Sequence, residues 1–200
     1  FAGPSEIMIV CDREDIPVDY LVRDMLSQAE HDPDAGAFLV TTSEKQAKKV
    51  ADRLKKLVPA LPRREIIEAS FKNRSAIILA EDMEEIFEVV NELAPEHLEV
   101  LTKEPFDDLY RIRNAGAIFL GPNTPEPVGD YFAGPNHTLP TSGCAKFSSP
   151  LGVQDFVKTS SVISYSAERL QNQGEQIIRF AEEEELFSHA AAIQARLDNL

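Results

Sequence analysis

The sequence is poor in cysteine and has no tryptophan. Its two cysteines, Cys11 in an apolar run and Cys144 in a polar segment, have no neighbour at CxxC spacing. This pattern argues against a zinc knuckle, a CxxC redox motif and a disulfide framework. Two reduced thiols are typical of a cytoplasmic protein, and the cytoplasm is the location that we expect.

Basic residues are also scarce. The 200 residues include 20 Lys and Arg against 34 Asp and Glu, which gives a net charge of −14. We expect no nucleic-acid partner, because attraction to phosphate backbones needs a basic surface. No window approaches the roughly 18 uncharged apolar residues of a membrane span, so we expect no membrane partner. Small molecules and other proteins are the partner classes left.

Short apolar runs alternate with segments of helical periodicity over the first 120 residues. This alternation predicts an α/β fold with a parallel sheet and helical crossovers. Residues 57–73 indicate a loop with one short helix. The expected strands are 6–11, 37–41, 75–80, 97–101 and 117–120, and the expected helices are one whose apolar residues recur from 18 to 29, one from Ser43, 82–93 and 107–114.

The pattern changes at Gly121. Residues 121–150 hold six prolines and four glycines, and a loop of this length and polarity often carries function. Beyond it we expect two helices, 162–180 and 183–200. About fifty residues are too few to bury a core alone, so they should pack on the α/β unit or on a second subunit. We therefore divide the chain into an α/β domain, 1–150, and a helical tail, 151–200.

Two pairs of polar side chains stand out in the α/β region. Gln28 and His31 are three positions apart late in an expected helix, and an amide oxygen beside an imidazole suits zinc, although such pairs are more often surface residues. Glu96 and His97 combine groups competent in acid–base chemistry in a proline-fixed turn, whose alternative is a polar turn without function. Neighbouring residues in extended chain point to opposite sides, so we expect these two to approach a substrate separately and not to contact each other.

Two further pairs lie beyond residue 128. Asp130 and His137 belong to a glycine-containing loop that could approach a ligand closely, or that is simply an exposed loop. Glu184 and His189 lie in the helical tail, five positions apart, beside an acidic run typical of a solvated surface. Each pair alone is a weak signal.

Taken together, five segments resemble, in the same order, those of histidinol dehydrogenase. They are AGPSE (2–6), MLSQAEHDPD (25–34), APEHLE (94–99), GDYFAGPNHTLPT (129–141) and SSPLGVQDF (148–156). The resemblance covers essentially the whole chain. It implies a zinc-containing homodimer that oxidises L-histidinol to L-histidine, through L-histidinaldehyde, in two NAD-dependent steps that close histidine biosynthesis.

The resemblance also implies roles for individual residues. The implied zinc ligands are Gln28, His31, Asp130 and His189, with His189 supplied to the site of the partner subunit by the helical tail. Zinc would mainly orient the substrate. Four nitrogen and oxygen ligands suit this metal.

The implied acid–base residues are Glu96 and His97. His97 would take the hydroxyl proton of histidinol as hydride leaves, and Glu96 would act as base on the water that adds to the aldehyde. Ser5, His137 and Glu184 resemble substrate-contacting positions, Glu184 also across the dimer. The substrate should in addition meet His97 and the four zinc ligands.

The chain departs from the family in length, since family members are about twice as long. No GxGxxG turn is present, so we expect the NAD site in a missing N-terminal half. The chain would then be an incomplete Rossmann-like unit with a dimerisation tail, inactive alone. The alternatives are a non-catalytic metal- or substrate-binding fragment and a related zinc-dependent dehydrogenase of another polar alcohol. Ser5, His137 and Glu184 favour histidinol.

Overall fold

The computed structural model describes residues 3–200. Phe1 and Ala2, the second of which belongs to the AGPSE segment, lie outside the described residues. Contacts divide the chain into two compact units, one ending at Phe156 and the other spanning Val157–Leu200.

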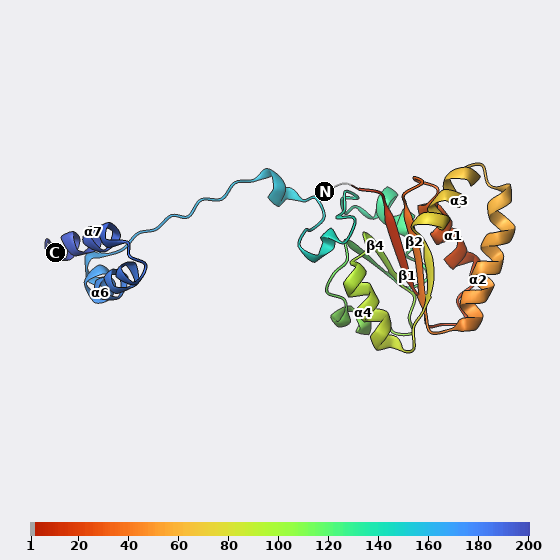
Figure 1. Ribbon diagram of the computed structural model, residues 1–200, viewed down its shortest axis with the longest axis horizontal. Coiled ribbons are helices and arrows are strands. Elements are labelled where there is room, and N and C mark those ends of the chain that lie inside the picture. Colours follow the sequence, from red (N-terminus) through yellow and green to blue (C-terminus); the bar gives the residue numbers. More distant parts are fainter. Residues whose placement is uncertain (1–2) are drawn as a thin grey trace. The chain divides into compact units, whose positions relative to one another are not determined.

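A five-stranded sheet forms the centre of the first unit (Figure 1). All neighbouring strands are parallel, in the order β3-β2-β1-β4-β5. This confirms the predicted α/β fold, and the order is that of the first five strands in a doubly wound fold. The strands are β1 (Glu6–Val10), β2 (Gly36–Thr41), β3 (Ala76–Leu79), β4 (His97–Val100) and β5 (Ala117–Leu120).

Helices cover both faces of this sheet (Figure 1). On one face, α1, α2 and α3 enclose a core that includes Ile7, Ile9 and Leu39. On the other face, α4 packs on Met8 and Leu98. The helices are α1 (Val18–Ala29), α2 (Glu44–Leu57), α3 (Arg64–Asn73) and α4 (Met83–Leu93).

Helix α4 ends in a way that sets the start of β4. The residue after it, Ala94, adopts a left-handed conformation (φ 50°), and Pro95 follows. A left-handed residue with a following proline stops a helix sharply. The chain therefore enters β4 with Glu96 just outside the strand and His97 as its first residue.

The helix expected over 107–114 is wrong. Only a short 3₁₀ segment, η2 (Asp107–Arg111), forms there. The side-chain oxygen of Asn91 accepts the main-chain N–H groups of Arg113 and Asn114, at 2.6 and 3.2 Å. These bonds hold the chain extended before β5 and take the donors that another helical turn would use.

The chain reverses direction after β5. We call residues 121–133 the return segment; it contains α5 (Glu126–Val128) and a π-helical turn, η3 (Gly129–Ala133). Gly121 at its start has a φ of 80°, which favours glycine. A Cβ atom on Gly129 would lie 2.6 Å from the ring of Phe119, so glycine allows the segment to lie directly against β5.

The second unit is a pair of helices, α6 (Ala167–Glu183) and α7 (Phe187–Leu197). Ser166 caps α6, which begins five residues later than expected. The helices approach closely at Gly174, where an added Cβ would lie 2.7 Å from Leu197. No helix within residues 3–200 is long and apolar enough to cross a membrane.

Candidate functional site

The imidazole of His97 lies at the centre of a buried polar cluster. It is the first residue of β4, pairs with Ile7 in β1, and is almost inaccessible to solvent. Its Nδ1 atom lies 2.9 Å from the main-chain oxygen of Glu6. Because a carbonyl oxygen can only accept, Nδ1 carries the hydrogen. In the neutral ring, Nε2 is then the free basic nitrogen, and it has no hydrogen-bond partner within residues 3–200.

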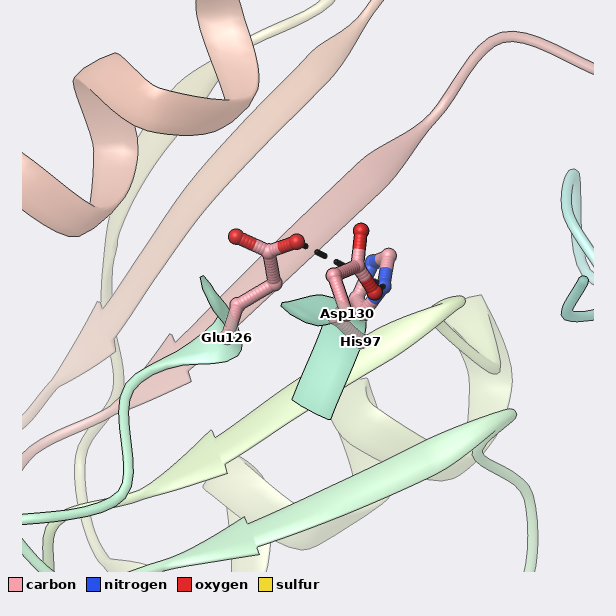
Figure 2. A group of neighbouring side chains, drawn as sticks. All are labelled: His97, Glu126 and Asp130. Atoms are coloured by element: carbon pink, nitrogen blue, oxygen red, sulfur yellow. Dashed lines mark ion pairs between the residues drawn. The ribbon is translucent and has the colours of Figure 1, made fainter. Parts of the chain in front are cut away.

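Two carboxylates from the return segment face that nitrogen (Figure 2). The Asp130 Oδ1 atom lies 3.7 Å from Nε2, and the Glu126 Oε1 atom lies 4.0 Å from it. One ligand atom from each of the three residues lies within 4.8 Å of the others, close enough to hold a metal ion together. The cluster can therefore accept a proton or a cation.

Glu96 joins the same cluster from the other end of the ring. Its Oε2 atom accepts a hydrogen bond from the Ser5 hydroxyl at 2.5 Å and from the Glu6 main-chain N–H at 2.9 Å. It also lies 3.4 Å from Nδ1 of His97. The expectation that Glu96 and His97 do not contact each other is therefore wrong. Glu96 precedes the strand and turns back toward β1, so the alternation of an extended chain does not apply to it.

The carboxylates decide the protonation of His97. Burial of the ring lowers its pKa, but the hydrogen bond and charge of Glu96, the Glu6 carbonyl and the charge of Glu126 outweigh burial and raise the pKa. Burial, together with a hydrogen bond to Asp130, raises the pKa of Glu126 to about 7. A cation bound at the carboxylates would neutralise the charge that stabilises the imidazolium. It would thereby lower the pKa of His97 and favour the neutral ring.

Gln28 lies fully buried on α1, and neither atom of its side-chain amide has a hydrogen-bond partner within residues 3–200. A buried amide without partners costs roughly 1–3 kcal/mol, so this side chain is suited to a ligand. The helix ends at Ala29, and His31 therefore lies in the following turn and not in the helix as expected. Its side chain is exposed, and its main-chain N–H donates to the main-chain oxygen of Gln28 at 3.2 Å.

The remaining predicted site residues lie outside the cluster. His137 is exposed, and with Asp130 it lines a cavity of about 330 Å³ beside β5. Glu184 follows α6 and His189 lies on α7; both are exposed and line an apolar cavity of the helix pair. Ser5, Glu96, His97 and Asp130 are thus the predicted residues that the structure brings together.

Sequence reasoning missed two buried acids. Glu126 lies between two prolines in a loop, and nothing in the sequence marks it as buried. Glu99 lies in β4 two residues after His97, and its Oε1 atom accepts the main-chain N–H of Glu126 at 2.8 Å. An acid that alternates with a histidine in an apolar strand was an available signal for Glu99.

The fold and the cluster define an α/β protein with a buried histidine–carboxylate centre suited to proton transfer or metal binding. The sequence profile described as histidinol dehydrogenase matches residues 1–197. Histidinol dehydrogenase of Halalkalibacterium halodurans is 54% identical over 198 residues, which are 99% of this chain and 46% of that protein. The enzyme of Helicobacter hepaticus is 49% identical over 199 residues, 100% of this chain and 45% of that protein.

A solved structure gives the same result. The crystal structure of histidinol dehydrogenase from Elizabethkingia anophelis matches with a TM-score of 0.89 and 33% identity, covering 99% of this chain and 45% of that one. The chain belongs to the histidinol dehydrogenase family. It spans about half the length of the curated relatives it matches.

The buried acid Glu99 leads to a prediction about stability. Burial, together with the negative charge of Asp24, raises the pKa of Glu99 to about 9, from 4.5. Between these values the folded state holds a proton that the unfolded state releases, so stability falls as pH rises. Glu99→Gln should flatten this fall by at most ~1.4 kcal/mol per pH unit, measured by urea unfolding from pH 5 to 9. An unchanged pH slope would show that Glu99 is ionised in the folded protein.

Proposed function

We propose that the full-length protein containing this chain oxidises L-histidinol to L-histidine, through L-histidinaldehyde, in two NAD-dependent steps. The observation that carries the proposal is the orientation of His97, whose Nδ1–H bonds to Glu6 and whose free Nε2 faces a carboxylate-lined space. This arrangement suits a general base for a substrate hydroxyl.

Zinc is the metal that the predicted ligand set suits, with Gln28, His31 and Asp130 from this subunit. The buried Gln28 amide, which has no hydrogen-bond partner in the described part of the chain, supports this role, because its oxygen is already desolvated and free to coordinate. The metal would supply a positive charge that orients the substrate amine and imidazole. His97 is left out of the ligand set, since a metal on Nε2 would block the base.

The two oxidations require two proton acceptors. In the first, His97 Nε2 accepts the hydroxyl proton of histidinol while the carbon-bound hydrogen leaves as hydride to NAD⁺, giving the aldehyde. In the second, Glu96 takes one proton from the water that adds to the aldehyde, and a second hydride transfer to NAD⁺ leaves the carboxylic acid, which releases its remaining proton to solvent to give the carboxylate. The bonds from Ser5 and from the Glu6 N–H hold Glu96 in place for this step.

The second unit fits a role in a shared dimer site. Its helix pair leaves Phe180 and Phe187 about two-thirds exposed, at 69% and 67%, and Phe180 lines a cavity together with Glu184 and His189. We propose that this surface packs on a second subunit, where Glu184 contacts the substrate and His189 completes the zinc site. Ser5 and His137 contact substrate from the first unit.

Zinc content separates ligands from the base. In the full-length protein, His31→Ala and Asp130→Ala should each lower bound zinc about 10-fold or more at limiting free metal. His97→Ala should retain zinc, because the ring is not a ligand. Elemental analysis after dialysis measures this. Unchanged zinc in His31→Ala and Asp130→Ala, or loss of zinc in His97→Ala, would contradict the assignment.

Activity gives the corresponding prediction for the base. His97→Ala should lower kcat for histidinol oxidation by about 100-fold or more, as expected for loss of a general base. NADH formation is followed at 340 nm, and Glu88→Ala, an exposed change on α4, is the control. Wild-type protein that binds zinc but forms no NADH from histidinol would overturn the proposed reaction.

The shared site predicts complementation between two inactive dimers. When His97→Ala and His189→Ala proteins exchange subunits, each mixed dimer should have one intact site, restoring about a quarter of the activity. The matched control mixes His97→Ala with Asp130→Ala, whose lesions lie on the same subunit's side of the site and leave both sites broken. No recovery in the first mixture, with subunit exchange shown by mass spectrometry, would place His189 within its own subunit's site.

A further inference from the structure

The acid Glu99 lies directly behind the cluster. It follows His97 by two residues in β4, so both side chains project from the same face of the sheet. Its side chain is 1% exposed, and one oxygen accepts the main-chain N–H of Glu126 at 2.8 Å. Glu99 thus connects the strand that carries His97 to the segment that carries the opposing carboxylates.

The return segment contacts the sheet through the ion pairs of Glu126 and Asp130 with His97, through the packing of Gly129 on Phe119, and through Glu99. Among residues 3–200, the bond to Glu99 is the one side-chain hydrogen bond between the sheet and residues 122–133. Further along, Tyr131 and Phe132 are 83% and 95% exposed, so apolar burial does not anchor this end. The Glu99 contact is therefore the hydrogen bond by which a sheet side chain fixes the backbone of this segment at Glu126.

A small shift of this segment would move both carboxylates. Glu126 begins α5, and Asp130 follows one helical turn later, 3.7 Å from His97 Nε2. Removing a group that orients metal ligands or reacting side chains commonly lowers metal affinity or activity by about 10–100-fold. Displacements of about 1 Å are enough to disturb both coordination and proton transfer. Burying a carboxyl group is also costly, and one of the two Glu99 oxygens is bonded to this main-chain amide.

We infer that Glu99 is a positioning residue of this site: its buried carboxyl group accepts the Glu126 N–H and thereby holds Glu126 and Asp130 opposite His97. The inference rests on the proposed function for its catalytic readout. The neutral amide of glutamine keeps an acceptor oxygen of the same reach, whereas leucine fills the space without one. The two substitutions therefore separate the hydrogen bond from the packing.

The test uses Glu99→Leu and Glu99→Gln in the full-length protein. Glu99→Leu should weaken zinc binding about 10-fold and lower kcat/KM for histidinol about 100-fold, while Glu99→Gln should recover most of both. Gln46→Leu is the matched control, because it removes another buried side-chain bond, to the Ile16 carbonyl at 2.9 Å, away from the cluster. It should cost stability without changing zinc affinity.

Hydrogen exchange at the Glu126 amide gives a readout that does not depend on activity. Exchange should become faster in Glu99→Leu and remain slow in Glu99→Gln and Gln46→Leu. The inference is overturned if folded Glu99→Leu keeps the wild-type exchange and zinc affinity, or if Glu99→Gln is damaged as severely as Glu99→Leu. If Glu99→Leu shows faster exchange and weaker zinc binding while the wild-type protein oxidises no histidinol, the proposed function alone is refuted and the positioning role of Glu99 stands.

A second pair of variants applies if Glu99→Leu does not fold. Glu126→Ala and Glu126→Pro both remove the carboxylate, but only proline also removes the N–H that Glu99 accepts. Proline suits the first position of a helix, which Glu126 occupies in α5. Zinc affinity should be at least about 5-fold lower in Glu126→Pro than in Glu126→Ala. Equal affinities would contradict the positioning role.

Discussion

The hydrogen bond from His97 Nδ1 to the main-chain oxygen of Glu6 gives the cluster its chemistry. It determines which ring nitrogen faces the carboxylates, and it exists because β1 and β4 pair with Ile7 opposite His97. A slip of one residue in this register would turn His97 to the α4 face, among apolar side chains. The pairing of β1 with β4 therefore contributes to the core and also determines that Nε2 is the basic nitrogen of His97.

The second constraint is electrostatic, because several acids surround one buried ring. Full ionisation in a dry site would cost far more than the fold can supply. Burial accordingly raises the pKa of Glu99 to about 9 and the pKa of Glu126 to about 7. Burial therefore favours a bound proton at these acids or a cation in its place, such as a metal ion or a substrate amine.

Much of the fold could be predicted from periodicity, because strands and crossover helices repeat their own local signals. For example, β5 at 117–120 matches expectation, and α1 spans the apolar periodicity that runs from 18 to 29. The helix expected at 107–114 failed because Asn91, more than fifteen residues away, takes the necessary N–H groups. The candidate site was likewise only partly predictable from the sequence. A family resemblance could identify His97 and Asp130, but the path of the return segment, which decides that they meet, has no local signature.

That path also explains an unusual location. Ligands of open α/β sheets usually bind beyond the carboxyl ends of the strands, yet Ser5 and His97 lie at the amino ends of β1 and β4. The return segment explains this location. It leaves the carboxyl end of β5 and runs back along the sheet, so that Asp130 lies beside His97 at the amino ends of the strands. A side chain of the sheet can hold the backbone of this segment along the strands. Glu99, in the middle of β4, does so by accepting the main-chain N–H of Glu126.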